Sequence, residues 1–180
     1  MKPFRIDAVA AGTQGGVIGM THCPGRLETD LFAAVAQDDI DGHVRIIADW
    51  GAHALVSLIE SEEFSSYGVE SLPALTTGLG IRHLHLPIQD MGIPDEKFER
   101  AWRTDGAALR EMLLGGQRIV LHCLAGMGRT GTIAARLLVE LGVQPAEAIG
   151  IVRRARPGTI QTADQERHVL GCRYIGNGGD

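Results

Sequence analysis

The sequence predicts an α/β fold, a single domain with a mainly parallel central sheet flanked by helices. Short apolar runs alternate with longer segments of helical periodicity, the pattern of strands joined by crossover helices. The 180 residues, 44% hydrophobic and 22% charged, are ordinary for one globular domain. No repeat or linker interrupts the chain. We expect one domain at 1–175 and a disordered tail at 176–180.

The first 60 residues predict a hairpin, a helix and a buried strand. Strands are expected at 4–10 and 16–20, separated by a glycine-containing turn. Apolar positions predict a helix at 28–49, which Asp41-Gly42 could divide in two. The continuous apolar run at 54–59 is typical of a strand buried on both faces.

The middle of the chain predicts two short helices, a strand and a long helix. The short helices are expected at 62–67 and 72–79. Residues 81–86 alternate in polarity as a strand does, and Pro87 ends that strand. A proline followed by two acidic residues is a favourable helix start, so a helix is expected from 94 to about 114.

The last third predicts a strand, a loop and three helices. The strand covers 118–122, and helical spacing of apolar residues begins at Thr130 and ends near Gly142. Further helices are expected after Pro145 and at 162–174. Residues 123–129 therefore join the end of a strand to the start of a helix.

This strand-to-helix loop has the features of a phosphate-binding site. Backbone N–H groups before a helix are unpaired, and the helix dipole makes the region attractive to anions. Glycines allow the loop to curl so that successive N–H groups converge, and the residues expected to do so are Leu124, Ala125, Gly126, Met127 and Gly128. The guanidinium of Arg129 would close this ring, since its planar fork matches two phosphate oxygens.

Cys123 is the expected nucleophile of the loop. The start of a helix, an arginine and the hydroxyl of Thr130 all stabilise a thiolate, the reactive form of cysteine. A single buried cysteine is more often inert, and composition alone would favour that reading. The spacing of cysteine, glycines, arginine and threonine on a strand–loop–helix favours chemistry instead.

The bulk composition excludes several classes of function. The net charge is −5, no run of basic residues occurs, and lysine stands only at positions 2 and 97, so we expect no nucleic-acid partner. No segment has the roughly 20 apolar residues of a membrane span. Three cysteines without CxxC spacing indicate a reducing cytoplasm. We expect a cytoplasmic monomer that uses no cofactor.

The sequence resembles the cysteine-dependent protein phosphatases. His122-Cys123-x5-Arg129-Thr130 matches their HCx5R(S/T) signature, and "HCLAGMGRTGT" is most similar to dual-specificity members. The segments "HCPGR", "DWGAHALVSLIE", "HLPIQDMGIPD" and "RPGTIQTADQ" resemble the kinase-associated phosphatase group and its bacterial relatives. The resemblance covers about residues 16–172.

The resemblance implies a role for each matching residue. Cys123 would form a phosphocysteine and Arg129 would bind the phosphate. His122 would order the loop, and Thr130 would donate a hydrogen bond to the departing thiolate. Asp90 matches the general acid of the family, and Gln161 lies near the position of a water-orienting glutamine.

Two carboxylates compete for the role of acid. Asp95 follows Pro94 and precedes Glu96, so it suits the first turn of a helix. Asp90 stands on a loop after the 81–86 strand. Because reactive loops gather at the carboxyl ends of strands in α/β sheets, Asp90 and Cys123 should meet there. We favour Asp90.

The remaining candidates have simpler structural explanations. His83 and His85 share a strand face but lack a neighbouring carboxylate or cysteine, so we predict no metal site. His22-Cys23 begins a structural turn, and Cys172 belongs to the core of the last helix. The basic side chains at the end of the helix after Pro145 favour a solvated helix end. They are Arg153, Arg154 and Arg156.

The function predicted is hydrolysis of phosphotyrosine and phosphoserine/threonine in phosphoproteins. The alternatives are a small-molecule or lipid phosphatase of the same fold and a catalytically dead module that binds phosphate. Leu124 and Met127 are neutral where relatives acting on highly charged substrates carry basic residues, which disfavours the first alternative. The presence of Cys123, Arg129 and Asp90 together disfavours the second.

Overall fold

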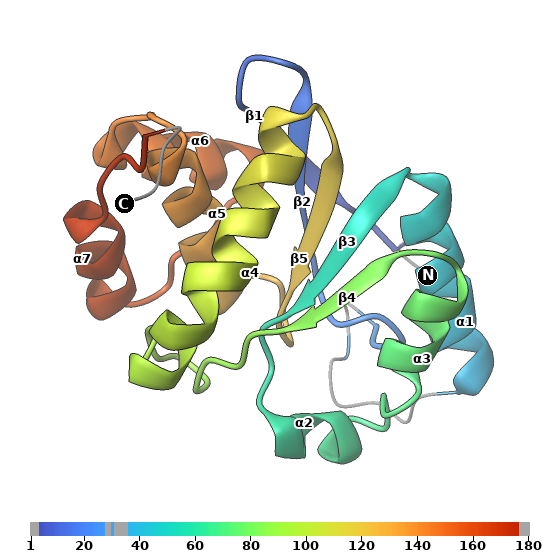
Figure 1. Ribbon diagram of the computed structural model, residues 1–180. Helices are drawn as coiled ribbons and strands as arrows, with labels where there is room; N and C mark the ends of the chain where they lie inside the picture. The colour runs from blue at the N-terminus through green and yellow to red at the C-terminus, as the bar shows by residue number, and fades with distance from the viewer. Residues whose placement is uncertain (1–3, 28–29, 31–35, 177–180) are drawn as a thin grey trace.

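A five-stranded sheet forms the centre of the computed structural model, which describes residues 4–27, 30 and 36–176 (Figure 1). Its strands lie in the order β1-β2-β5-β3-β4. Their bounds are β1 Asp7–Ala11, β2 Gly16–Thr21, β3 Ala52–Ser57, β4 Arg82–His85 and β5 Arg118–His122. β1 and β2 form the expected antiparallel hairpin, and all other pairs are parallel. The predicted α/β class with a mainly parallel sheet is confirmed.

Helices cover both faces of this sheet (Figure 1). The helices are α1 Gln37–Asp49, α2 Ser61–Ser66, α3 Leu72–Gly78, α4 Glu96–Leu114, α5 Gly128–Glu140, α6 Pro145–Ala155 and α7 Ala163–Gly171. One face is covered by α1 and α3, which contact β3 and β4, and the other by α4 and α5, which contact β2 and β5. α6 and α7 pack on the outer side of α5, and α2 lies beyond the end of β3.

α5 is buried along its whole length, from Gly128 to Glu140. It is enclosed by the sheet, α4, α6 and α7. A helix buried on every side has little freedom to shift in a close-packed interior. The loop that precedes α5 is therefore attached to the most enclosed helix of the molecule.

Parallel pairing brings the carboxyl ends of β3, β4 and β5 to one edge of the sheet. In Figure 1 this edge is at the lower end of the sheet, on the side of α2. α2 follows β3, the loop carrying Asp90 follows β4, and the loop carrying Cys123 follows β5. The topology thus collects at one edge three segments that are far apart in the sequence.

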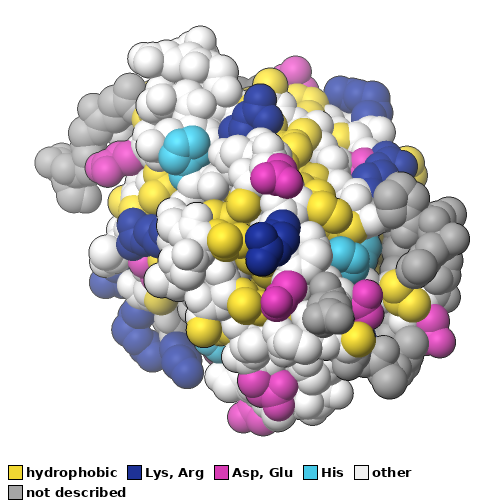
Figure 2. All heavy atoms as spheres, turned by 90° about the vertical axis from the view of Figure 1, so that its right-hand side faces the viewer, with side chains coloured by type: hydrophobic (Ala, Val, Ile, Leu, Met, Phe, Trp, Pro, Cys, Tyr) yellow, Lys and Arg dark blue, Asp and Glu magenta, His cyan; other side chains and the backbone are white. Residues whose placement is uncertain are grey.

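The side of the molecule that carries α1 and α3 has a mixed surface (Figure 2). Hydrophobic side chains are exposed there among charged ones, and acidic and basic side chains are interspersed. Ile46 in α1 and Leu79 directly after α3 are 42% and 44% exposed. The described side chains in this view form no large patch of one charge.

Several predicted helix boundaries differ from the structure. α1 begins at Gln37 because Ala36 has extended backbone angles (φ −89°, ψ 144°), and it continues through Asp41-Gly42 without a break. The earlier part of the predicted 28–49 helix lies outside the described residues, apart from positions 30 and 36. α5 begins at Gly128, two residues before the predicted start.

The last helix is shorter than predicted and does not contain Cys172. α7 ends at Gly171, and Cys172 has extended backbone angles (φ −68°, ψ 156°). Cys172 is partly buried at this helix end, and its thiol contacts the carbonyl oxygen of His168 at 3.3 Å. Of the predicted tail, all but Gly176 lies outside the described residues.

Candidate active site

The loop after β5 forms a tight turn against β2. Cys123 directly follows the strand and is 3% exposed. Gly126 has a φ of +70°, and a Cβ atom there would lie 2.2 Å from the carbonyl oxygen of Thr21. Only glycine can occupy such a position. The predicted phosphate-binding residues make up this loop and the first position of α5: Leu124, Ala125, Gly126, Met127 and Gly128.

His122 anchors the loop from inside the sheet. Its ring is fully buried, with Nε2 lying 2.6 Å from the Ser57 hydroxyl and Nδ1 3.2 Å from the carbonyl oxygen of Cys123. Burial lowers the pKa of His122 to about 3, although the hydrogen bond to the Cys123 carbonyl works in the opposite direction. The imidazole is therefore neutral at physiological pH and acts as a hydrogen-bonding group.

Arg129 is held by a carboxylate from α2. Its side chain is 1% exposed, and Nη1 and Nη2 donate to the two carboxylate oxygens of Glu63 at 2.6 and 3.0 Å. Nη1 also donates to the carbonyl oxygen of Ile88 at 3.1 Å. Such a two-point ion pair fixes the plane of the guanidinium as well as its position.

Glu63 is itself fixed by neighbouring groups. Its carboxylate accepts hydrogen bonds from the backbone N–H of Glu60 at 2.6 Å and from the Tyr67 hydroxyl at 2.8 Å. Burial tends to raise the pKa of Glu63, but the hydrogen bonds from Arg129, Glu60 and Tyr67 and the charge of Arg129 lower it below its usual value. Glu63 is thus an anion that balances the buried arginine.

One edge of the Arg129 guanidinium remains available. Its Nε–H is buried and has no hydrogen-bond partner among the described residues. Glu63 occupies the end of the guanidinium formed by Nη1 and Nη2, which leaves the edge formed by Nε and Nη2. Oδ1 of Asp90 lies 3.1 Å from Nη2 at this edge. A phosphate oxygen pair would fit an edge of this shape.

Asp90 and Asp95 have different environments. The Asp90 side chain is 63% exposed and lies at the available edge of Arg129. Asp95 caps α4, where its carboxylate accepts a hydrogen bond from the backbone N–H of Phe98 at 2.7 Å. The predicted helix-start role of Asp95 is confirmed. Only Asp90, of the two, contacts the arginine of the loop.

Thr130 has a hydroxyl without a fixed partner. The residue is fully buried one position after Arg129, and its Oγ1 makes no hydrogen bond among the described residues. A buried hydroxyl normally finds a partner, because leaving it unpaired costs about 1–3 kcal/mol. This hydroxyl is therefore free to donate to a group that enters the site.

Two glutamines pack against the first residue of α5. A Cβ atom at Gly128 would lie 2.8 Å from Oε1 of Gln161 and 3.0 Å from Nε2 of Gln165. Gln165 is fully buried, accepts a hydrogen bond from the backbone N–H of Gln161 at 2.9 Å and donates to the carbonyl oxygen of Gly92 at 3.0 Å. Gln165 thus connects the Gln161 segment to the loop that carries Asp90.

The interpretation of the three arginines as a solvated cluster is wrong for Arg156. This side chain is buried, and it donates to the carbonyl oxygens of Gly126 at 2.8 Å and Ala125 at 3.0 Å. Its Nη1 forms an ion pair with Asp7 at 2.7 Å. Arg156 therefore braces the back of the loop after β5, where it binds two of the loop's carbonyl groups.

The remaining sequence candidates have hydrogen-bond partners or turn roles. Nε2 of His83 lies 2.8 Å from the Ser57 hydroxyl, and Nε2 of His85 lies 2.9 Å from the carbonyl oxygen of Ile59. No group of three or more metal-ligating side chains occurs among the described residues. The turn after His22 is confirmed, since Arg26 N–H donates to the carbonyl oxygen of Cys23 at 3.1 Å.

Several residues of the site were not predicted from the sequence. They are Ser57, Glu63, Arg156 and Gln165. A position for Glu63 near the site could have been predicted, because it belongs to a short helix that directly follows a buried parallel strand. Ser57 and Arg156 contact the site only through pairings between distant segments, which no local pattern reports. Gln165 bonds the nearby Gln161, but its bond to Gly92 likewise joins distant segments.

Comparison with known proteins identifies phosphatases among the relatives of this chain. A family model described as "Polymorphic toxin system, DSP-PTPase phosphatase" matches residues 31–143. Human cyclin-dependent kinase inhibitor 3 is 34% identical over 160 residues, which cover 84% of this chain and 69% of the relative. The tyrosine-protein phosphatase CDC14 of Saccharomyces cerevisiae is 40% identical over 83 residues, or 46% of this chain.

Solved structures extend the similarity to the whole fold. The structure of kinase associated phosphatase with a serine in place of its catalytic-site cysteine has a TM-score of 0.77 and 25% identity, with 93% of each chain covered. Tk-PTP in its active form has a TM-score of 0.62 at 25% identity.

The match to the curated relatives is uneven in length. The chain spans 14% of yeast CDC14 and 50% of rat cyclin-dependent kinase inhibitor 3. No helix among the described residues is long and apolar enough to cross a membrane.

The family match over more than half of the chain and the 34% identity to the human relative agree on one assignment. The chain belongs to the dual-specificity protein phosphatase (DSP-PTPase) superfamily.

Proposed function

We propose that this protein hydrolyses phosphate monoesters of phosphoproteins, on tyrosine and on serine or threonine, through a phosphocysteine formed at Cys123. The observation that carries the proposal is the arrangement around Arg129. Glu63 holds one end of its guanidinium, and the edge left available faces the Asp90 carboxylate at 3.1 Å from Nη2. Beside the loop that begins with Cys123, this guanidinium edge would receive the anion and the Asp90 carboxyl would donate the proton.

In the first step, Sγ of Cys123 attacks the phosphorus atom of the bound ester. The loop N–H groups and the Nε–Nη2 edge of Arg129 stabilise the charge that accumulates on the non-bridging oxygens. The S–P bond forms as the P–O bond to the leaving group breaks, and Asp90 donates its proton to the departing oxygen. Asp90 displaced from Arg129 by the incoming phosphate would be in reach of that oxygen.

In the second step, water attacks the phosphocysteine. Asp90, now ionised, accepts a proton from the water, the S–P bond breaks, and inorganic phosphate leaves. The buried hydroxyl of Thr130 has no hydrogen-bond partner among the described residues and would donate to the thiolate as it departs. Gln161, whose side chain lies against Gly128, would contact the attacking water. No metal takes part in either step.

The surroundings of Asp90 favour an uncharged, partly apolar substrate surface. Met91 and Ile93, on the same loop, are 50% and 41% exposed. Leu124 and Met127 add no positive charge to the phosphate-binding loop. These features suit a phosphorylated side chain of a protein better than an inositol polyphosphate, whose many charges call for basic residues.

We further propose that the protein acts as a cytoplasmic monomer, without nucleic-acid or membrane partners. Its three cysteines are free thiols in the structure, which suits a reducing compartment. The net charge of −5 and the mixed surface of Figure 2 do not favour binding to a polyanion.

Turnover of an aryl phosphate tests the proposed function. The parent protein should release inorganic phosphate in the presence of EDTA, and Cys123→Ser should abolish turnover while still binding phosphate, because the loop N–H groups and Arg129 remain. Turnover of phosphotyrosine peptides, phosphoserine peptides and inositol phosphates then ranks the substrate classes. Turnover by Cys123→Ser at a few per cent of the parent rate would refute the cysteine mechanism.

A further inference from the structure

Ser57 joins two histidines from neighbouring strands. It is the last residue of β3, is fully buried, and pairs in register with His122 of β5. Its Oγ lies 2.6 Å from Nε2 of His122 and 2.8 Å from Nε2 of His83, which belongs to β4 on the other side of β3. Three strands thus contribute to one continuous chain of hydrogen bonds that ends at the Cys123 carbonyl.

The hydrogen bonds of this series can point in only one direction. A carbonyl oxygen accepts but never donates, so Nδ1 of His122 must carry a proton to bond the Cys123 carbonyl at 3.2 Å. Because His122 is neutral, with a pKa of about 3, its Nε2 has no proton and accepts from the Ser57 hydroxyl. The Ser57 oxygen then accepts from Nε2–H of His83.

His83 can supply that proton without carrying a charge. Burial, together with the charge of His85, lowers the pKa of His83 to about 4, so the ring is neutral at physiological pH and needs its proton on Nε2. The ring edge also packs on Phe64, with ring centroids 6.4 Å apart. Phe64 follows Glu63, the residue that holds Arg129, so His83 is linked to Glu63 through Phe64 and to His122 through Ser57.

The last hydrogen bond of this series, from His122 to the Cys123 carbonyl, fixes the peptide that joins Cys123 to Leu124. A trans peptide is planar, with its C=O and the following N–H pointing in opposite directions. The hydrogen bond from His122 holds the Cys123 carbonyl toward the ring, and the N–H of Leu124 must therefore point away from it. Any rotation of His122 would rotate this N–H, which is the first of the loop donors.

We propose that Ser57 and His83 are positioning residues for the phosphate-binding loop, acting through His122 on the peptide that follows Cys123. The proposal rests on the proposed function, since it concerns how that same loop binds phosphate. Neither residue contacts the substrate. Their contribution is to hold His122 in one tautomer and one orientation.

Two variants and a matched control separate this role from general stability. Ser57→Ala removes the donor to His122, and His83→Phe keeps a ring against Phe64 but removes the donor to Ser57. His85→Phe is the control: His85 lies two residues along the same strand, also packs on Phe64, and bonds Ile59 instead of Ser57. His83→Gln, which retains an N–H donor, should restore part of any loss.

We expect the dissociation constant for inorganic phosphate to rise and kcat/KM for an aryl phosphate to fall about 10- to 100-fold in Ser57→Ala, because small misplacements of catalytic groups have effects of this size. His83→Phe should show a smaller loss, of roughly threefold to tenfold. His85→Phe should stay within about twofold of the parent. Thermal unfolding measured on the same samples identifies any variant that simply fails to fold.

Nitrogen-15 NMR of the histidine rings tests the direction of these hydrogen bonds without any turnover. The parent protein should show His122 as the Nδ1–H tautomer and His83 as the Nε2–H tautomer. An Nε2–H tautomer at His122, or equal phosphate binding by His83→Phe, His85→Phe and the parent, would overturn the inference while leaving the proposed function intact. A parent protein that neither binds phosphate nor turns over an ester would overturn the proposed function and this inference with it.

Discussion

At the scale of single residues, the site depends on the different surroundings of two similar carboxylates. Asp90 is exposed and contacts Nη2 of Arg129, whereas Asp95 accepts the backbone N–H of Phe98 and starts α4. A carboxylate engaged in a helix cap is not available to approach a leaving group. An exposed carboxylate on a loop is available, and general acid catalysis requires that reach before anything else.

Asp90→Asn should lower kcat on simple aryl phosphates by about 10²- to 10⁴-fold, because the asparagine cannot donate a proton to the leaving oxygen. Substrates with leaving groups that need no proton should be affected much less. Asp95→Asn should leave kcat nearly unchanged and reduce stability by at most about 1 kcal/mol, since asparagine is also a good helix cap. Steady-state kinetics and urea unfolding of both variants check this. A large kinetic effect at Asp95 with none at Asp90 would reverse the assignment.

At the scale of elements, the short helix α2 determines the orientation of Arg129. α2 is only six residues long and has no buried residue, so it contributes little to the core. Its Glu63 nevertheless binds both Nη atoms of the arginine and leaves the Nε–Nη2 edge toward the loop. The main contribution of α2 is therefore to hold the carboxylate of Glu63 against Arg129.

Glu63→Gln should lower kcat/KM about tenfold or more, because an amide cannot accept from both Nη atoms and the guanidinium loses its fixed plane. Glu62→Gln is the matched control, since Glu62 is the exposed neighbour on the same helix. It should behave as the parent protein does. If the two variants had equal activity, the support of Arg129 by α2 would be refuted. Kinetics with one aryl phosphate at several concentrations provide the comparison.

The sequence predicts elements well where the signal is local. The alternating strand before Pro87, the continuous apolar strand at 54–59 and the helix that begins after Pro94 all lie near their predicted places. The start of α1 was predicted too early, because apolar spacing continues upstream in the sequence although Ala36 itself has an extended backbone. Periodicity reports which face is apolar, and it does not report where the backbone leaves the helix.

The same limit applies to the site. Cys123, Arg129 and Asp90 follow from strand-to-loop transitions that any α/β sheet brings together. Arg156 is different, because its burial depends on Asp7, which lies 149 positions away along the chain. A basic residue near a helix end is usually solvated, and only the packing of β1 against the loop after α6 makes this one an exception.

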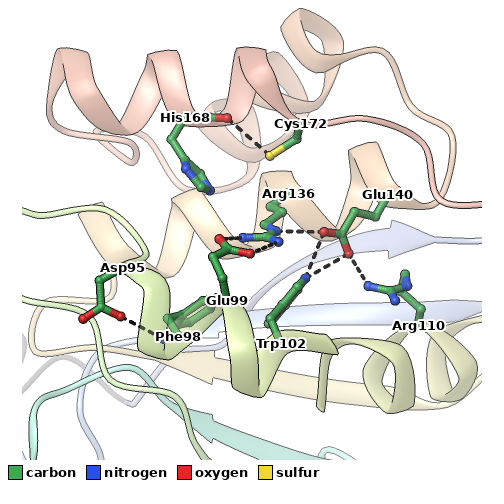
Figure 3. Close-up of polar contacts among 9 residues, drawn as sticks. All are labelled: Asp95, Phe98, Glu99, Trp102, Arg110, Arg136, Glu140, His168 and Cys172. Carbon is green, nitrogen blue, oxygen red and sulfur yellow. Dashed lines mark hydrogen bonds and ion pairs between the residues drawn. The ribbon is translucent and has the colours of Figure 1, made fainter. Parts of the chain in front are cut away.

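At the scale of the whole molecule, a buried network of charges ties α4 to α5 (Figure 3). Glu140, 3% exposed, accepts from Trp102 Nε1 at 2.9 Å and from Arg136 Nε at 2.7 Å, and it also pairs with Arg110. Arg136 continues to Glu99 and lies over the ring of Trp102 at 4.8 Å. The network fixes the helix whose first turn carries Arg129.

Glu140→Gln should lower the free energy of unfolding by about 3 kcal/mol or more, because it leaves Arg110 and Arg136 without their shared buried anion. Asp164→Asn is the control: its partner Arg167 and Asp164 itself are 69% and 68% exposed. Loss of that surface pair should cost less than about 1 kcal/mol. Urea unfolding of the two variants makes the comparison. Equal effects would show that the network contributes no more than a surface ion pair.

The central claim is that Cys123 forms a covalent bond to phosphorus. The parent protein is mixed with an aryl phosphate that has a good leaving group, quenched in acid within milliseconds, digested and mapped by mass spectrometry. The account predicts one phosphoryl group on the peptide that contains Cys123, and none on that peptide in Cys123→Ser. Turnover without any phosphorylated Cys123, or with the phosphoryl group on another residue, would contradict it.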